Sequence, residues 1–192
     1  MTMRVKEKRE PAWATLKSRI VDILLKIFAS DSPIRKRLSD PALIIQGAGV
    51  QAGQHVLEVG CGRGFFTIPL AEKLGREGYL HALDVTQEAV DYVARKLEAA
   101  GLSNARVFRA NALNSGLPGG ALDLVLLFGV IPSPTLPLGQ LLPEIHRVLK
   151  PDGALAVWTA VPGWSPATVT RNGLFAYAGK TKNVCNFRKV CR

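Results

Sequence analysis

The sequence predicts an α/β domain built on a parallel, doubly wound sheet, and three observations support this fold class. Apolar runs of strand length alternate with segments of helical periodicity, which is the pattern of successive strand–helix–strand units. The first apolar run ends in a glycine-rich turn at residues 60–64, and the second ends in an acidic residue, Asp84. Ligands in such folds lie beyond the carboxyl ends of the strands. These two features therefore mark an expected binding crevice.

The individual elements are predicted from the same patterns. Apolar runs bounded by glycine, proline or polar residues predict strands, and apolar residues at helical spacing predict helices. Thr86 is placed to cap the helix that starts at residue 87, and Gly101 follows the end of that helix. The predicted strands are 55–60, 79–84, 105–109, 122–128 and 153–160, and the predicted helices are 40–48, 65–75, 87–100 and 137–149. A hairpin of 174–178 and 184–190, joined by residues 180–183, completes the domain.

The segment 1–37 differs from the single domain expected at 38–192. Its first ten residues look disordered, and residues 12–29 carry apolar residues at helical spacing with charges between them. A second, short basic helix is expected to follow from Ser32-Pro33 to about Leu38. The apolar stretch is shorter than the ~20 residues of a membrane span, and its charges do not suit a signal peptide. Three roles stay open for this amphipathic helix: packing on the domain or covering the site, attachment to a membrane surface, or a dimer contact.

The glycine turn distinguishes between two kinds of adenosine cofactor. A dinucleotide site needs glycines at the first, third and sixth positions, so that a pyrophosphate can lie on the helix N-terminus. Here the glycines are Gly60, Gly62 and Gly64, and the sixth position is Phe65. Glu58 precedes the turn, and its charge would repel a pyrophosphate. The turn instead suits a ligand that carries an ammonium and a sulfonium, such as S-adenosylmethionine.

Several ordered motifs make residues 38–190 similar to the class I S-adenosylmethionine-dependent methyltransferases. They are VLEVGCGRGFFT from Val56, the acid Asp84, RANA from Arg109, ALDLVLLFG from Ala121, and LPEIHRVLKPDGALAV from Leu142. The subgroup that the chain resembles is the small-molecule type related to ubiquinone and menaquinone biosynthesis. The resemblance implies a Rossmann-like sheet of seven strands, mostly parallel with an antiparallel last strand, and extra helices at the N-terminus.

The resemblance also implies a set of residues for the cofactor S-adenosylmethionine. Asp84 corresponds to the acid that accepts hydrogen bonds from both ribose hydroxyls. Val85 is expected to pack on the adenine, and Asn111, where many members have aspartate, to meet the adenine amino group. The cofactor-binding residues expected on this basis are Glu58, Gly60, Cys61, Gly62, Gly64, Asp84, Val85, Asn111, Ala112 and Phe128.

The acceptor pocket is expected in the loops after the fourth and fifth strands, residues 129–137 and 160–166. Both loops are apolar and rich in proline. Ile131, Pro132 and Trp164 are the candidate acceptor-binding residues, with a core position under the final hairpin as the alternative for Trp164. An apolar wall favours a small hydrophobic acceptor over a nucleic acid.

The sequence does not assign a catalytic residue. Methyl transfer from a sulfonium is an in-line displacement, for which the protein chiefly aligns the acceptor and excludes water. His55, His81 and His146 are all expected away from the crevice, and Asp123, near the start of its strand, is expected to be structural. We therefore expect an acceptor atom that is intrinsically nucleophilic or easily deprotonated. No pattern of metal ligands occurs in the sequence, so no metal is expected.

The positive charge lies at the two ends of the chain. Residues 1–37 carry a balance of +6, residues 38–170 of −2, and residues 171–192 of +6. Basic ends either keep the protein soluble or attract nucleic acid or anionic lipid. The three cysteines form no disulfide framework, which suggests a cytoplasmic protein, with association at a membrane surface as an option. The oligomeric state is not predicted.

Three functions remain after this reading. The favoured one is a methyltransferase that acts on a small, hydrophobic acceptor. The second is an RNA or protein methyltransferase that docks through the basic termini, which the apolar loops disfavour. The third is a non-catalytic domain that binds S-adenosylmethionine and serves as an accessory to another protein.

Overall fold

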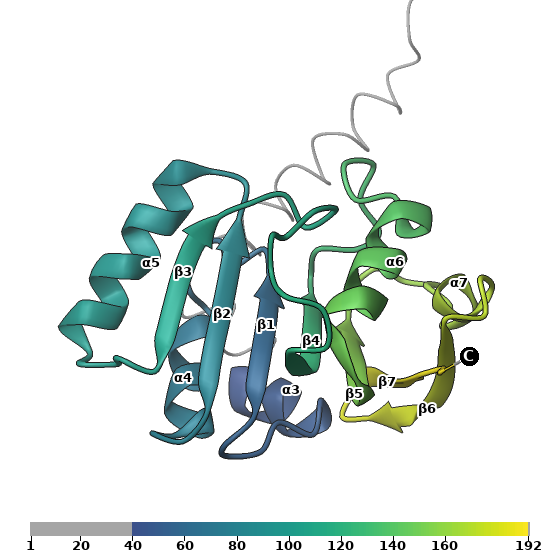
Figure 1. Cartoon of the computed structure of the whole chain (residues 1–192), viewed down its shortest axis with the longest axis horizontal. Helices are drawn as coiled ribbons and strands as arrows, with labels where there is room; N and C mark the ends of the chain where they lie inside the picture. Colours follow the sequence, from purple (N-terminus) through teal and green to yellow (C-terminus); the bar gives the residue numbers. More distant parts are fainter. Residues whose placement is uncertain (1–39, 192) are drawn as a thin grey trace, which may run out of the picture.

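The computed structural model describes residues 40–191 and confirms the predicted fold class (Figure 1). Seven strands form one sheet in the order β3-β2-β1-β4-β5-β7-β6. The strands are β1 His55–Val59, β2 Tyr79–Asp84, β3 Ala105–Arg109, β4 Leu122–Phe128, β5 Leu149–Trp158, β6 Phe175–Thr181 and β7 Val184–Lys189. Strands β1 to β5 pair in parallel, and β7 runs antiparallel to both β5 and β6. The tail and helices expected before residue 39 lie outside the described residues.

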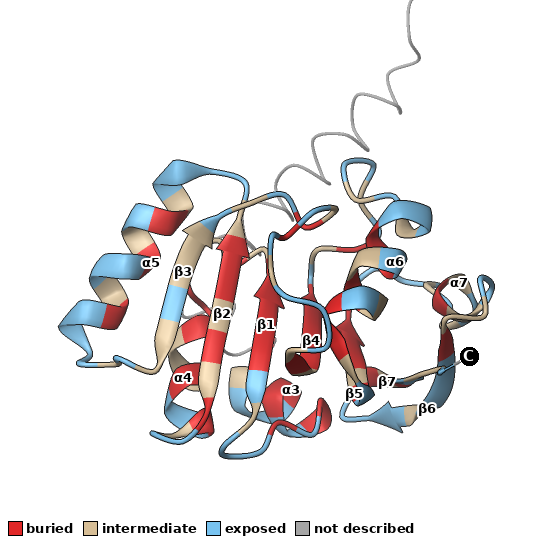
Figure 2. Cartoon of the chain, viewed as in Figure 1, coloured by how far each residue is buried: buried red, intermediate tan, exposed pale blue. Residues whose placement is uncertain are grey.

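Helices cover both faces of the sheet. They are α3 Pro41–Gly47, α4 Thr67–Leu74, α5 Gln87–Ala99, α6 Leu138–Val148 and α7 Ala167–Thr170. Buried side chains of α3, α4 and α5 pack on one face, and those of α6 and α7 pack on the other. Because both faces of the sheet are covered, β1 and β4 are buried along most of their length (Figure 2). Strands in this position have nearly continuous apolar sequences.

The strand order places a ligand crevice at β1. This strand lies between β2 and β4, where the direction of the chain's progress across the sheet reverses. The arrowheads of β1, β2 and β3 point to the same edge (Figure 1). Loops on either side of a reversal part at the carboxyl edge, and this is where open α/β sheets bind ligands. The glycine turn joins β1 to α4 at this edge.

Asp123 fastens the opposite edge of the sheet. Its Oδ2 accepts a hydrogen bond from the His55 N–H at 2.7 Å, and its Oδ1 accepts one from Lys150 Nζ at 2.6 Å. Burial opposes ionisation of Asp123, but the hydrogen bonds from Lys150 and His55 outweigh it and lower its pKa. Asp123 therefore ties together the starts of β1, β4 and β5, as its place in the sequence predicted.

Helix α3 is held against the C-terminal hairpin. A Cβ on Gly47 would lie 2.6 Å from the carbonyl oxygen of Thr181, so only glycine allows this approach. Asn186 Nδ2 donates to the Gly47 carbonyl oxygen at 2.9 Å. Within residues 40–191, the longest helices fall short of what a membrane crossing requires.

Three elements differ from the sequence-based prediction. Strand β6 continues to Thr181, beyond the predicted end at residue 178, because Lys180 and Thr181 pair with Cys185 and Val184. Strand β5 begins at Leu149, directly after α6, because Leu149 pairs with Leu122 before the register shifts. The sequence had predicted that this strand begins at residue 153. The four-residue helix α7 was not predicted, because it is too short to show helical periodicity.

Candidate cofactor and acceptor site

Backbone hydrogen bonds tie the glycine turn to the end of β2. The N–H groups of Gly60 and Cys61 donate to the Leu83 carbonyl oxygen at 2.8 and 3.0 Å. The Gly62 N–H donates to Asp84 Oδ2 at 3.0 Å. The turn and the acidic residue, which are 22 positions apart for this last pair, therefore form one structural unit.

The three glycines of the turn have different roles. All have positive φ angles, +75° for Gly60, +52° for Gly62 and +77° for Gly64, a conformation that glycine adopts without strain. A Cβ on Gly60 would meet Val130 Cγ1 at 2.5 Å, and one on Gly64 would meet Val93 Cγ2 at 3.3 Å. A Cβ on Gly62 would meet nothing within 4 Å. Gly60 and Gly64 thus allow close packing, whereas Gly62 leaves its backbone open to a ligand.

Asp84 is fixed by three donors. Besides the Gly62 N–H, its Oδ1 accepts hydrogen bonds from the N–H of Thr86 at 3.0 Å and from the Thr86 hydroxyl at 2.9 Å. Thr86 stands at the N-cap position of α5, as predicted, but its hydroxyl is directed to Asp84, so the expected capping bond is replaced by this contact. These bonds orient the carboxylate at the carboxyl edge of the sheet.

The turn lies in a negative electrostatic environment. Glu58 is 2% exposed, and its Oε2 accepts a hydrogen bond from the Thr67 hydroxyl at 2.6 Å, at the start of α4. Burial, and after it the charges of Glu58 and Asp84, raises the pKa of the Cys61 thiol above its usual value. A potential that disfavours a thiolate also disfavours a pyrophosphate and favours a cation. Glu58 is therefore buried next to the turn, and its charge contributes to the negative potential there.

The residues expected at the adenine lie beside Asp84, with one exception. Val85 is 58% exposed although it is apolar. The Ala110 N–H donates to the Asp84 carbonyl oxygen at 3.0 Å, which brings the loop after β3 to this point. Asn111 follows on that loop and is exposed, with its Oδ1 accepting the Leu113 N–H at 3.0 Å. Ala112 instead is buried in the core on the α6 side.

Phe128 packs against an aromatic residue next to the glycine turn. It is buried, and its ring centroid lies 4.9 Å from that of Phe66, next to the turn. Phe66 also contacts Phe65, at 4.9 Å, and Trp158, at 6.0 Å. Phe65 is the residue at the sixth position of the turn, so aromatic packing replaces the third glycine of a dinucleotide site.

A pocket of about 780 Å³ lies at the carboxyl end of β5 and is bordered by the β6–β7 hairpin. Trp164 lines it and also packs on the core of the α6 side, so its position is compatible with both roles considered for this residue. Ile131 is 1% exposed and belongs to that core. Pro132 is exposed, and neither it nor Ile131 lines this pocket.

The pocket adjoins the glycine turn through the loop after β4. The Gly129 N–H donates to the carbonyl oxygen of Trp158, a residue that lines the pocket, at 2.8 Å. The next residue, Val130, fills the space beside Gly60. The loop after β4 therefore lies directly between the glycine turn and the pocket.

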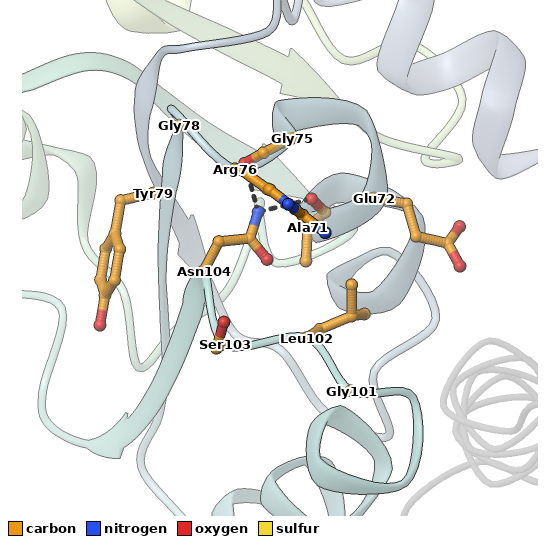
Figure 3. A pocket seen from close by; sticks show the side chains of 10 residues that line it. All are labelled: Ala71, Glu72, Gly75, Arg76, Gly78, Tyr79, Gly101, Leu102, Ser103 and Asn104. Atoms are coloured by element: carbon orange, nitrogen blue, oxygen red, sulfur yellow. Dashed lines mark hydrogen bonds between the residues drawn. The ribbon is translucent and has the colours of Figure 1, made fainter.

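A second pocket, of about 560 Å³, lies at the amino edge of the sheet, between the C-terminal ends of α4 and α5 (Figure 3). Asn104 projects into it and donates through Nδ2 to the carbonyl oxygens of Ala71 and Gly75, at 2.8 and 2.7 Å (Figure 3). These bonds satisfy carbonyl groups that the end of α4 leaves without a helical partner. The side-chain amide of Asn104 in this pocket therefore stabilises the end of α4.

The described residues place no histidine at the carboxyl edge. His55 begins β1, and His81 lies within β2, where burial, followed by the charges of His55 and Arg106, lowers its pKa. His146 Nε2 lies 2.9 Å from the Val190 carbonyl oxygen. Among residues 40–191, no group of His, Cys, Asp and Glu is arranged to hold a metal ion.

Comparison with known proteins agrees with this geometry. A family model described as a methyltransferase domain matches residues 56–153, from β1 into β5. A crystal structure of a SAM-dependent methyltransferase from Aquifex aeolicus superposes with a TM-score of 0.70 and 25% identity, over 85% of this chain and 96% of that one. The chain belongs to the class I SAM-dependent methyltransferases. The family predicted from its motifs is thereby confirmed.

Curated relatives of this methyltransferase domain include demethylmenaquinone methyltransferases. The demethylmenaquinone methyltransferase of Listeria welshimeri is 35% identical over 120 residues, which are 60% of this chain and 50% of the relative. That of Geobacillus stearothermophilus is 34% identical over 111 residues, 57% of this chain and 47% of the relative. The chain spans about half the length of these relatives.

Proposed function

We propose that this methyltransferase domain binds S-adenosylmethionine between the glycine turn and Asp84 and methylates a small, apolar acceptor. The observation that carries the proposal is the hydrogen bond from the Gly62 N–H to Asp84. This bond connects the unobstructed backbone of Gly62 to the carboxylate that is proposed to bind the ribose, at the point where the strand order reverses.

The residues at this edge fit the parts of the cofactor. Asp84 offers a carboxylate for the ribose hydroxyls, and the exposed Val85 offers an apolar surface for the adenine. Asn111 lies on the adjoining loop with a side-chain amide for the adenine edge. The charges of Glu58 and Asp84 suit an ammonium and a sulfonium.

The acceptor is proposed to occupy the pocket beside β5. Trp158 and Trp164 are among the large side chains that line it, and both suit a hydrophobic molecule. The relatives named demethylmenaquinone methyltransferase support an apolar, small-molecule acceptor for this chain.

The chemical demands on the protein are modest. S-adenosylmethionine supplies a methyl group that is activated by the positive charge on its sulfur. Asp84 and the turn hold and orient the cofactor, and the apolar pocket aligns the acceptor and excludes water. Because the described residues place no histidine at this edge, the acceptor atom is proposed to be nucleophilic by itself or to lose its proton to solvent.

The test is formation of S-adenosylhomocysteine from S-adenosylmethionine by the purified chain. Assays contain demethylmenaquinone, other small apolar acceptors, RNA, or no acceptor. Product that depends on an apolar acceptor supports the proposal. Product that depends only on RNA would assign the second function. Cofactor binding without turnover on any acceptor would instead support a non-catalytic accessory domain.

A further inference from the structure

We propose that Lys180 recognises a negatively charged group on the acceptor, which makes the substrate class a small amphipathic anion. Such a molecule has an apolar body and one anionic group. This inference rests on the proposed function, because it assumes that the pocket beside β5 holds the acceptor. Lys180 lies on β6 and lines that pocket.

A β-bulge turns Lys180 toward the pocket. In the β6–β7 pair, Tyr177 lies opposite Phe187, but Lys180 lies opposite Cys185, because the register shifts between Tyr177 and Gly179. Directly opposed residues share a face of the sheet, so Lys180 lies on the same face as Tyr177. In a regular strand, residues three apart face opposite sides. Bulges commonly re-aim a side chain beside a functional site.

Gly179 makes this bulge possible. Its φ angle is +129°, a conformation that other residues rarely adopt. A Cβ at this position would meet nothing within 4 Å, so the backbone conformation requires glycine here and close packing does not. The orientation of Lys180 is therefore built into the strand.

The charge of Lys180 is uncompensated in its surroundings. It is the one charged residue that lines the pocket, and no carboxylate lines it. Residues 171–192 contain no Asp or Glu at all. Within the described part of the chain, the Lys180 ammonium has no ion pair or hydrogen bond. An ammonium beside an apolar wall attracts an anion more strongly than one in open water.

The rest of the lining suits an apolar body. Val161 and Tyr177 are 48% and 47% exposed, and both line the pocket together with Trp164. They are two of the four large apolar side chains that are exposed in the described residues. The pocket thus combines an apolar wall with a single cation, which is the complement of an amphipathic anion.

The inference is tested with a matched pair of probes, 2-naphthoate and its neutral analogue 2-naphthamide. Calorimetry gives the Kd of each for the wild type, for Lys180→Met and for Lys182→Met. Lys182 lies in the same hairpin and its removal changes the net charge equally, but it does not line the pocket. Binding of S-adenosylmethionine is measured on all three proteins, so that a failure of the proposed function is recognised separately.

The wild type is expected to bind naphthoate about fivefold or more tightly than naphthamide. Lys180→Met should reduce this ratio to about one, and Lys182→Met should retain it. A ratio of one in the wild type, no binding of either probe, or a ratio that survives in Lys180→Met would overturn the inference. So would Lys180-dependent binding to phosphatidylglycerol vesicles without binding of naphthoate, since the surface would then contact membranes.

Discussion

At the scale of single residues, Gly62 and Asp84 divide the work of the proposed cofactor site. Gly62 presents an unobstructed backbone with a φ angle of +52°. Its N–H holds the Asp84 carboxylate in place. Gly62 and Asp84 thus set the geometry of the proposed site, and the other residues at this edge, such as Val85, provide additional contact surface.

Gly62→Ala is expected to weaken S-adenosylmethionine binding about tenfold or more, because the new methyl group enters the space above the turn. Alanine at a positive φ angle also costs about 1 kcal/mol of stability. Gly53→Ala is the matched control, since Gly53 has a φ angle of +81°, meets nothing within 4 Å and precedes β1 at the other edge. Both variants should lose similar stability in chemical denaturation. Equal loss of cofactor affinity in the two would contradict the assignment of Gly62.

The three cysteines should differ in reactivity. Cys61 and Cys185 are buried and Cys191 is exposed. The raised pKa of Cys61 leaves little of the reactive thiolate at pH 8. Iodoacetamide should therefore modify Cys191 in the native protein and Cys61 only after unfolding, as read by peptide mass spectrometry. Labelling of Cys61 as fast as that of Cys191 would show that the turn is not packed as described.

At the scale of elements, one ion-paired network fixes the loop after β3 onto α6. Glu144 Oε1 accepts hydrogen bonds from the Ser115 N–H and hydroxyl, and Glu144 Oε2 accepts one from Arg147 Nε. Arg147 Nη2 also donates to the Leu117 carbonyl oxygen. The loop that carries Asn111 is thereby anchored a few residues beyond the proposed adenine contact.

Glu144 should make stability depend on pH. The hydrogen bonds from Arg147 and then Ser115 outweigh burial and lower its pKa from 4.5 to about 2. A lowered pKa stabilises the fold above the unfolded value, and this contribution is lost as the pH falls from about 4.5 toward 2.

Glu144→Gln should cost about 1–2 kcal/mol of stability at pH 7, which is less than the full pKa shift corresponds to because Arg147 is half-exposed. The variant should also show a weaker dependence of stability on pH between about 4.5 and 2. Urea denaturation across pH measures this, with Glu98→Gln at an exposed position of α5 as control. An unchanged slope would refute the role of Glu144.

Two glycine-to-alanine substitutions should act in opposite directions. Gly47→Ala places a methyl group 2.6 Å from the backbone oxygen of Thr181, and it should cost about 1–3 kcal/mol by separating α3 from the hairpin. Gly139→Ala, in α6 with nothing within 4 Å, should raise stability by about 0.5–1 kcal/mol. Thermal unfolding of both variants tests the packing of α3. A neutral Gly47→Ala would contradict it.

Local patterns sufficed for the parts of the molecule that depend on local chemistry. The strands at 105–109 and 122–128 have the predicted bounds, because their apolar runs end in clear breakers. The turn and Asp84 were visible for the same reason. The pairing of Leu149 with Leu122, the burial of Ile131 and Ala112, and the bulge that orients Lys180 depend on contacts between distant segments. No pattern within one segment reports these.

At the scale of the whole molecule, the topology and the charge distribution act together. The reversal of strand order at β1 opens the crevice, and the parallel strands deliver the glycine turn, Asp84 and the loop after β3 to one edge. The central part of the chain, residues 38–170, is nearly neutral with a balance of −2, while the ends are basic. The negative potential at the turn is therefore local, and it comes from Glu58 and Asp84.

This local potential predicts which adenosine cofactor binds. Calorimetric titration of the wild-type chain with S-adenosylmethionine and with NAD, repeated on Asp84→Ala, makes the comparison. S-adenosylmethionine should bind with a Kd on the order of micromolar, NAD should not bind, and Asp84→Ala should weaken S-adenosylmethionine binding about tenfold or more. Binding of NAD in the absence of binding of S-adenosylmethionine would contradict both the cofactor assignment and the proposed methyl transfer.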